Sequence, residues 1–382
     1  MVPTPNSPQK QFRKIISFYV KSMKVLWLNW RCWLNPAMGG AEVFTYEVAK
    51  RLVASGHDVT LFTSKFPGCK NEETVEGIKI VRAGGRFTVY HQAKKRYSKC
   101  FSKEGFDVII DEINTEPFFA PKFAKNGEKV IALIHQLARE FWFYETPFPI
   151  SYVGYHYLEN RWLKQYVDVN TITVSESTRK DLTALGYKHV TVVSEGLNFE
   201  PLQDLPKKNS KPIVAYSGRL KRAKRPDHAI KAFALVKEKI PDAELWVFGE
   251  GPFKKALEQI AGSGVRFFEN LSSSERRDLL SKSWVLVVPG LREGWGLNVI
   301  EANALGIPVV AYDVPGLRDS VRNNETGLLV ESGNMEDLAE KTLCVLSDSL
   351  LRERLSVNSL NYSKQFSWDK TAEEFIKLIT HD

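Results

Sequence analysis

Cysteine is scarce in this chain. Among 382 residues there are four cysteines, and no two of them stand at Cys-x-x-Cys spacing. Such scattered cysteines argue against a structural zinc site and against a disulfide framework, so we expect a reducing compartment. Long apolar runs are missing as well. No stretch of 18 apolar residues occurs, and we therefore expect no membrane-spanning helix.

Several motifs that define other functions are also absent. No Gly-x-Gly-x-x-Gly follows the first apolar segment, which ends at Asn29, and this speaks against a dinucleotide-dependent dehydrogenase. No signature of a nucleic-acid-binding module occurs, so a nucleic-acid partner is not expected. The chain has no Asp-x-Asp metal motif; the nearest sequence, Asp242-Ala-Glu244, begins a predicted strand, and we expect it on the surface. We expect neither a metal ion nor another cofactor.

The remaining composition is that of a globular protein. Hydrophobic residues make up 43% and charged residues 26%, and 382 residues suffice for two domains. The net charge of +8 is unevenly distributed: residues 1–100 hold 17 Lys and Arg against 6 Asp and Glu, whereas residues 201–382 hold 26 against 25. A basic first quarter indicates an anionic partner, such as a phosphate group or a membrane surface. The alternative is an ordinary solvated basic face.

The first 22 residues form a separate basic segment. Their apolar residues recur at helical spacing with lysine and arginine around them, which predicts a short amphipathic helix on an anionic bilayer. The alternatives are that this helix docks on the protein, or that the natural start is Met23. The apolar core is too short for a secretory signal peptide, and no small-residue cleavage site follows it. The apolar residues are Phe12, Ile15, Ile16, Tyr19 and Val20.

Apolar segments then alternate with helical patterns, which predicts parallel α/β structure. A polar, proline-containing stretch at 200–212 divides the pattern into two series and predicts a linker. Ligands of doubly wound sheets bind beyond the carboxyl ends of the strands, so the site is expected in a cleft between two domains. Strands are predicted at 24–29, 58–63, 78–82, 107–111, 129–134, 170–174 and 190–193, and then at 213–216, 244–248, 284–288 and 308–311.

The predicted organisation has four parts. They are an N-terminal extension at 1–22, a first domain at 23–205, a second domain at 206–365, and a C-terminal helix at 366–382 that crosses back to the first domain.

The most informative stretch is residues 292–306. A strand leads through a turn with Gly294 and Gly296 into a helix that begins near Leu297, and free backbone N–H groups at such a start form an anion site. Two carboxylates lie beside this turn, Glu293 on the loop and Glu301 in the helix. Because they would repel a phosphate group, we interpret them as acceptors for the hydroxyl groups of a ribose and a sugar.

A second cluster follows the first strand of the second domain. Residues 219–225 hold five cations, among which Arg219 is suited to bind phosphate oxygens as a fork and Lys224 as a point charge. The alternative is a solvated basic loop.

Taken together, these segments resemble glycosyltransferase family 4. Glu293 and Glu301 match its Glu-x7-Glu motif, and the resemblance covers nearly everything from Met23 to the end. It implies the GT-B fold, with two facing Rossmann-like domains and an interdomain cleft. The other landmarks, in order, are Gly39-Gly40-Ala41-Glu42, the strand-end His135, Val174-Ser175-Glu176-Ser177, Gly218-Arg219-Leu220 with Lys224, and Phe248-Gly249-Glu250-Gly251-Pro252.

The resemblance implies roles for these positions. Arg219 and Lys224 would neutralise the diphosphate of a nucleotide-sugar donor, Glu293 would contact the donor sugar, and His135 would lie near the sugar and the acceptor. Glu301 would accept hydrogen bonds from the ribose, and the turn at 249–251 would line the base pocket. The implied donor-binding residues are Gly39, Gly40, Gly249, Glu250, Gly251, Gly294, Trp295, Gly296, Leu297 and Glu301.

The implied reaction is a metal-independent hexosyl transfer with retention of the anomeric configuration. Fixed cations and helix-start amides would stabilise the departing diphosphate, which would itself help to deprotonate the acceptor. His135 is then either a base or a positioning group. The chain departs from the family at Ser194-Glu195-Gly196, where Pro-Asn-Gly is frequent, and this puts in doubt any role of the missing asparagine.

The acceptor is expected to bind the first domain. That domain contains an aromatic-rich stretch at 141–166 and a basic segment with Arg86, His91, Lys94, Lys95, Arg96 and Lys99. If exposed, the aromatic residues suit sugar stacking or a bilayer interface; if buried, they are core. We expect a lipid-linked or membrane-surface glycan as acceptor, and a cytoplasmic protein that binds the inner face of the membrane peripherally. The alternatives are a GT-B sugar-nucleotide epimerase, which needs no acceptor, and a non-catalytic nucleotide-sugar binding protein.

Overall fold

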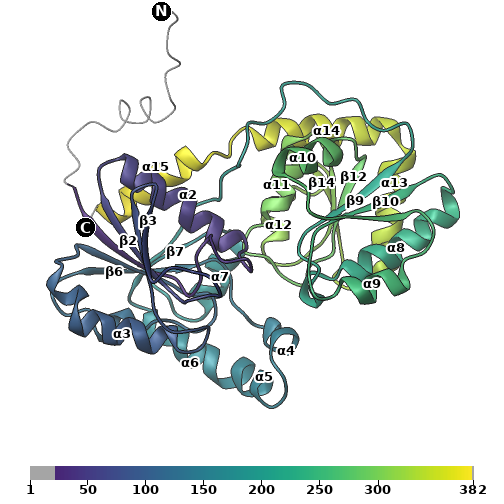
Figure 1. Ribbon diagram of the computed structural model, residues 1–382. Helices are drawn as coiled ribbons and strands as arrows, with labels where there is room; N and C mark the ends of the chain where they lie inside the picture. Colours follow the sequence, from purple (N-terminus) through teal and green to yellow (C-terminus); the bar gives the residue numbers. More distant parts are fainter. Residues whose placement is uncertain (1–21, 381–382) are drawn as a thin grey trace, which may run out of the picture.

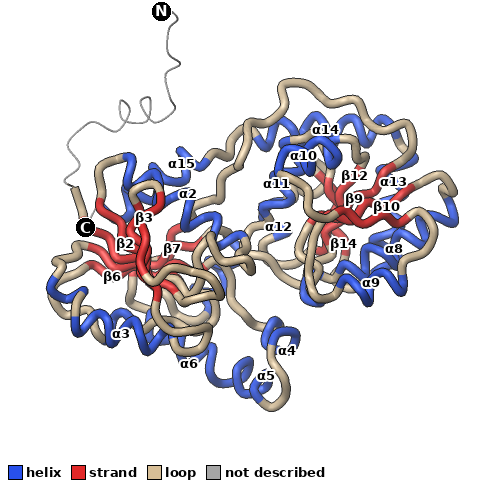
Figure 2. Tube along the Cα trace, viewed as in Figure 1, coloured by secondary structure: helices blue, strands red, loops and turns tan. Residues whose placement is uncertain are grey.

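Two sheets form the centres of the two halves of the chain in the computed structural model, which describes residues 22–380 (Figures 1 and 2). The prediction of two doubly wound α/β domains is confirmed, because each sheet is built almost entirely from parallel strands. The predicted helix within residues 1–22 lies outside the described residues except for Ser22. Within residues 22–380, no helix combines the length and the apolar character that crossing a bilayer demands.

The first sheet has eight strands in the order β3-β4-β2-β1-β5-β6-β7-β8. All neighbours are parallel except β3 and β4, which form an antiparallel hairpin. Strands β1 and β5 are buried along nearly their whole length, as expected for central strands covered by helices on both faces. The strands are β1 Lys24–Leu28, β2 Asp58–Thr63, β3 Glu72–Val75, β4 Ile78–Arg82, β5 Val108–Glu112, β6 Lys129–Ile134, β7 Asn170–Thr173 and β8 Val190–Val192.

The second sheet has six parallel strands in the order β11-β10-β9-β12-β13-β14. Its centre is again apolar and buried, which explains why the sequence pattern identifies β9, β10, β12 and β13. The strands are β9 Ile213–Ser217, β10 Glu244–Phe248, β11 Val265–Phe268, β12 Val285–Val288, β13 Val309–Tyr312 and β14 Gly327–Val330.

Helices cover both sheets. In the first domain they are α2 Gly40–Ala54, α3 Val89–Lys99, α4 Phe141–Glu145, α5 Ile150–Val153, α6 Glu159–Leu163 and α7 Glu176–Ala184, with a π-helical turn at Gly154–Leu158. The later helices are α8 Pro226–Lys239, α9 Lys254–Ile260, α10 Ser273–Ser281, α11 Leu297–Ala304, α12 Leu317–Ser320, α13 Met335–Ser347, α14 Ser349–Ser363 and α15 Trp368–Thr380.

The last helix, α15, lies against α2 on the first sheet, although α14 lies on the second (Figure 1). Its Phe375 stacks on Trp27 of β1 with ring centroids 5.3 Å apart and planes inclined by 3°. Trp368 is buried in the same cluster and donates from Nε1 to Asn198 Oδ1 over 2.9 Å. The chain therefore passes between the domains twice, once after β8 and once before α15.

The expectation that Asp242-Ala-Glu244 lies on the surface is half wrong. Asp242 is exposed, but Glu244 is buried at the start of β10, where it accepts a hydrogen bond from Trp246 Nε1 over 2.9 Å. Glu244 also pairs with Arg266 of the neighbouring strand β11 over 3.2 Å, so its role within this region is structural.

Candidate active site between the two domains

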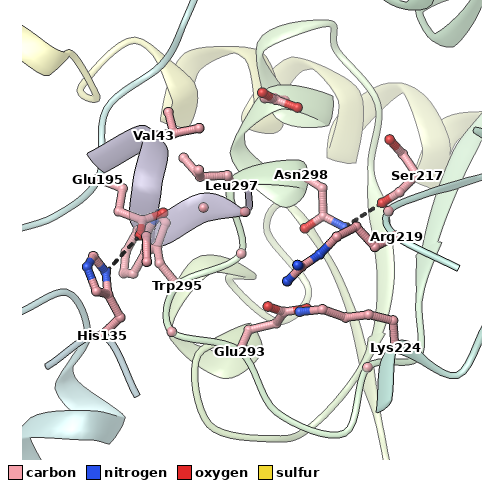
Figure 3. A pocket seen from close by; sticks show the side chains of 18 of the residues that line it. Val43, His135, Glu195, Ser217, Arg219, Lys224, Glu293, Trp295, Leu297 and Asn298 are labelled. Atoms are coloured by element: carbon pink, nitrogen blue, oxygen red, sulfur yellow. Dashed lines mark hydrogen bonds and ion pairs between the residues drawn. The ribbon is translucent and has the colours of Figure 1, made fainter. Parts of the chain in front are cut away.

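A cavity of about 520 Å³ lies between the domains, at the carboxyl ends of both sheets (Figure 3). Its walls come from the α2 start and the ends of β5, β6 and β8 on one side, and from the β9 end and the 290–298 turn on the other. A second hollow of about 630 Å³ adjoins it and shares Gly39, Gly40, Arg219 and Arg276 with it. The predicted position of the site, in a cleft beyond the strand ends, agrees with this geometry.

Arg219 of the second domain lies against Gly39 of the first at the cavity. A Cβ atom at position 39 would lie 3.0 Å from Arg219 Nη2, so glycine leaves room for the guanidinium. The Gly39 loop is held by Glu42, which accepts from the Gly39 amide and forms a two-pronged ion pair with Arg31 over 3.0 Å. Within residues 22–380 the Arg219 guanidinium makes no ion pair or hydrogen bond, so its donors remain available in the cavity.

Lys224 and Glu293 form an ion pair of 2.5 Å across the floor of the cavity (Figure 3). Lys224 comes from the loop after β9, and Glu293 from the loop after β12. The Glu293 backbone is held closely by Gly316, whose φ of 85° and lack of a side chain allow its Cα to approach the Glu293 carbonyl. An anion that enters the cavity would therefore compete with Glu293 for Lys224.

The start of α11 faces the same cavity. Gly296 precedes the helix with φ of 103°, a conformation that favours glycine, and the first two residues of α11, Leu297 and Asn298, line the cavity. Gly294 packs against the other domain, since a Cβ there would lie 3.1 Å from the His135 carbonyl oxygen. The predicted anion site at a helix start thus lies opposite the unpaired guanidinium of Arg219.

Glu301 lies within α11 and pairs with Arg276 of α10 over 2.7 Å. The Asn198 amide is 3.5 Å from the other carboxylate oxygen of Glu301. All three residues line the cavity, and Arg276 also borders the second hollow. Glu301 is therefore accessible to a hydroxyl donor, although a cation already occupies one of its oxygens.

His135 lies at the end of β6, on the opposite side of the cavity from Arg219 (Figure 3). Its Nε2 is 3.3 Å from Glu112 Oε1 and its Nδ1 is 3.5 Å from Glu195 Oε1. Burial alone would lower the pKa of the imidazole, but the two carboxylates outweigh it and raise the pKa to about 9.

The turn at 249–251 lines the second hollow, as the predicted base pocket requires. Gly249 and Gly251 have φ of 147° and 157°, and Cβ atoms there would lie 2.0 and 2.4 Å from the carbonyl oxygens of Gly218 and Leu220. Only glycine fits at these two positions. The carboxylate of Glu250, the residue between these glycines, accepts a hydrogen bond from the backbone N–H of Asn270 over 3.3 Å.

The structure brings the predicted site residues together around the two hollows. Trp295 differs from the other predicted site residues, because its side chain is buried against Phe366 with ring centroids 5.6 Å apart. It belongs to the apolar cluster around the first sheet and also lines the cavity. Sequence reasoning missed further lining residues, among them the polar residues Arg31, Glu195, Asn198, Arg276 and Asn298.

Known proteins that resemble this chain are glycosyltransferases. The model of a family described as "Glycosyltransferase Family 4" matches residues 38–200, and that of "Glycosyl transferases group 1" matches residues 200–361. The chain is 28% identical over 244 residues to a D-inositol 3-phosphate glycosyltransferase of Corynebacterium glutamicum, a match that covers 56% of this chain and 58% of that protein. A second such enzyme, from Rhodococcus jostii, is 32% identical over 177 residues, which is 43% of this chain and 39% of that one. The matched region thus spans about half the length of these relatives.

Solved structures share the fold over nearly the whole chain. The sucrose-phosphate synthase of Thermosynechococcus elongatus superposes with a TM-score of 0.78 at 22% identity, over 93% of this chain and 98% of that one. WaaG, a glycosyltransferase involved in lipopolysaccharide biosynthesis, has a TM-score of 0.74 at 18% identity, over 94% and 100%. The expected GT-B arrangement is thereby confirmed. The two family models match adjoining segments that together cover residues 38–361, and this chain therefore belongs to glycosyltransferase family 4.

Proposed function

We propose that this protein is a retaining, metal-independent hexosyltransferase that uses a nucleoside-diphosphate sugar. One observation carries the proposal: Arg219, which has no anionic partner within residues 22–380, faces the free amides at the start of α11 across a cavity that both domains line. A diphosphate between the domains would supply the missing negative charge. Three neighbours of the same fold point in this direction, since they are described as complexes with UDP or with UDP-2-fluoro glucose.

The proposed chemistry follows from where charge develops. The bond between the anomeric carbon and the phosphate oxygen breaks, a bond to the acceptor oxygen forms on the same face, and the acceptor proton passes to the departing phosphate. Arg219, Lys224 and the α11 amides stabilise the growing negative charge of that phosphate more strongly than they stabilise the bound donor. Glu293 and Glu301 supply acceptors for sugar and ribose hydroxyl groups.

The proposed acceptor is a lipid-linked or membrane-surface glycan, and the protein would act at the cytoplasmic face of a membrane. An apolar patch supports this assignment. It comprises Phe148, Ile150, Tyr152, Val153 and Tyr157, all exposed on the segment around α5. Phe148 is 81% exposed and Tyr157 63%, which is unusual for side chains of this size.

The first domain also exposes a basic helix. Helix α3 buries Val89, Ala93 and Tyr97 toward the sheet and exposes His91, Lys94, Lys95 and Lys99 on its outer face. Helices α3, α6, α5 and α4 follow one another along one edge of the first domain (Figure 1). Exposed apolar side chains and an exposed basic helix in the same domain suit an anionic bilayer. Of the aromatic stretch at 141–166, Trp142 and Tyr166 are buried and belong to the core.

The decisive experiment measures turnover of a panel of nucleotide sugars, with and without glycan acceptors. A transferase releases nucleoside diphosphate in proportion to acceptor and runs equally well in EDTA. An epimerase converts the nucleotide sugar without acceptor, and a binding protein gives no turnover at all. Glu293→Ala should abolish transfer while the chain remains folded; acceptor-independent conversion of the donor would refute the proposal.

A further inference from the structure

His135 is enclosed by two buried carboxylates that come from distant parts of the chain. Glu112 ends β5, and Glu195 follows β8; they are 1% and 4% exposed, and His135 is 6% exposed. Their oxygens approach opposite ring nitrogens, Glu112 at Nε2 over 3.3 Å and Glu195 at Nδ1 over 3.5 Å. The imidazole is therefore held between two anions, not beside one.

The two carboxylates have no other cation to balance them. Within the part of the chain that the structure describes, His135 is the ion-pair partner of both. Glu112 receives hydrogen bonds from Trp27 Nε1 over 2.7 Å and Thr45 Oγ1 over 2.6 Å, but both reach the same oxygen, Oε2. Its other oxygen, Oε1, has only the histidine. Two buried carboxylates beside a neutral ring would be uncompensated, which is costly in a low-dielectric interior.

The remaining neighbours of the ring add no competing charge. Phe44 of α2 meets the ring edge-on at 5.1 Å, Thr178 of α7 donates to the His135 carbonyl over 3.1 Å, and Gly294 closes the site from the other domain. The nearest charged groups on those elements are already paired: Glu42 of α2 with Arg31, and Glu293 with Lys224.

We propose that Glu112 and Glu195 hold His135 as a permanent imidazolium, so that the strand-end histidine faces the cavity as a fixed cation and cannot serve as a proton acceptor. A doubly protonated ring has no free lone pair, so it cannot remove a proton from the acceptor hydroxyl. Because Glu112 and Glu195 cover its two ring nitrogens, it acts on the bound donor through its charge and not through a hydrogen bond. Glu195 is a positioning residue that sets this charge state. The consequence for transfer rests on the proposed function, whereas the charge state itself does not.

The charge state can be measured without any substrate. The chain has seven histidines, and nitrogen-15 NMR of labelled protein distinguishes an imidazolium from either neutral tautomer. The His135 signals are assigned by their loss in His135→Gln. We expect His135 to remain protonated beyond pH 8 and Glu195→Gln to move its titration midpoint down by about 1–3 pH units, since one of two adjacent opposite charges is removed. Glu176→Gln, whose carboxylate is exposed and paired with Arg179, is the matched control and should leave the midpoint unchanged.

Two results would overturn the proposal: a neutral His135 ring at pH 7 in the unaltered protein, or an unchanged midpoint in Glu195→Gln. Glu112→Gln gives a second route if Glu195→Gln is poorly folded, because its side-chain oxygen can still accept from Trp27 and Thr45. The pH profile of transfer tests the role. Activity of Glu195→Gln should fall as pH rises through the new midpoint, whereas the unaltered protein keeps its activity there. Equal pH profiles despite a shifted midpoint would refute the role in transfer, and absence of transfer in every variant would refute the proposed function alone.

Discussion

The Arg219 guanidinium of the second domain lies against Gly39 of the first, where a Cβ atom would come within 3.0 Å of Nη2. Gly39 has an extended backbone, with φ of −145°, so the position does not call for glycine on conformational grounds. Its lack of a side chain serves the arginine instead. The absence of a side chain at position 39 therefore leaves space in the cavity for Arg219, the one guanidinium there that has no partner within residues 22–380.

Arg219→Ala should weaken binding of a nucleoside diphosphate about 10- to 100-fold. A charge-assisted hydrogen bond contributes ~1.5–3 kcal/mol, and each ~1.4 kcal/mol corresponds to a factor of ten in affinity. Because Arg219 makes no ion pair within the described residues, the free energy of unfolding should change by no more than about 0.5 kcal/mol. Calorimetric titration and urea unfolding measure the two quantities.

The matched control is Arg222→Ala on the same loop, whose guanidinium lies 5.7 Å from the Phe253 ring centroid and outside both hollows. Equal loss of affinity in the two variants would show that only the general positive charge of the loop matters.

Asp181→Asn should loosen the closed arrangement of the domains. Arg292 of the second domain is buried and pairs with Asp181 of α7 over 2.7 Å, and with the more exposed Glu140 over 3.6 Å. Removing the closer charge should cost about 1 kcal/mol and lower kcat/KM for transfer about threefold to tenfold. Small-angle scattering should show a larger radius of gyration. The control, Asp168→Asn, breaks an exposed pair with Lys188 within the first domain and should change neither quantity.

Strand ends were the reliable guide to the site. Arg219 and Lys224 follow β9, Glu293 follows β12, and His135 follows β6, and parallel strands bring their carboxyl ends to one edge. The pattern missed β3, β11 and β14, which lie at sheet edges. Strands β3 and β11 are short and only partly buried, so the burial that makes a central strand recognisable is weak in them. Strand β14 is largely buried, but it has only four residues and begins with a glycine.

The partners of these groups were not foreseeable in the same way. Glu112 is the last residue of an apolar strand, Glu195 lies in a loop 60 positions after His135, and nothing in the local sequence joins either of them to His135. The sequence pattern predicts that Arg276 is a surface residue of a polar helix, but it forms an ion pair with Glu301. Each of these pairings joins elements of one domain that are distant in sequence, and no local pattern encodes such contacts. The departure at Ser194-Glu195-Gly196 was the one available signal.

Lys208 should make stability depend on pH in the alkaline range. Its ammonium is enclosed at the domain linker, where Nζ donates to the Ser281 carbonyl over 3.1 Å. Burial, together with nearby Arg352, lowers its pKa from 10.5 to about 7. Between pH 7 and 10.5 the unfolded chain therefore binds more protons at this group than the folded one, so the group's contribution to stability increases with pH.

Lys208→Met should remove this dependence. The free energy of unfolding of the unaltered protein, relative to the variant, should rise by on the order of 2 kcal/mol between pH 7 and 9. Urea unfolding at the two pH values measures the change. Lys207→Met alters the exposed neighbouring lysine and should run parallel to the unaltered protein. If the free energy of unfolding of Lys208→Met changes with pH as it does in the unaltered protein, the Lys208 ammonium is not desolvated.

Replacing Phe148, Ile150 and Tyr157 together by serine should reduce sedimentation with anionic vesicles, because these residues have the largest exposed fractions in the apolar patch. Folding should be unaffected, since the three residues contribute little to the core. A matched variant replaces Leu350 and Val357, which are exposed on α14 of the second domain, and should sediment like the unaltered protein. Deleting residues 1–22 provides the second arm. If the triple variant pellets normally and only the deletion fails to pellet, the N-terminal segment is the anchor; if both pellet normally, the membrane-surface acceptor loses its support.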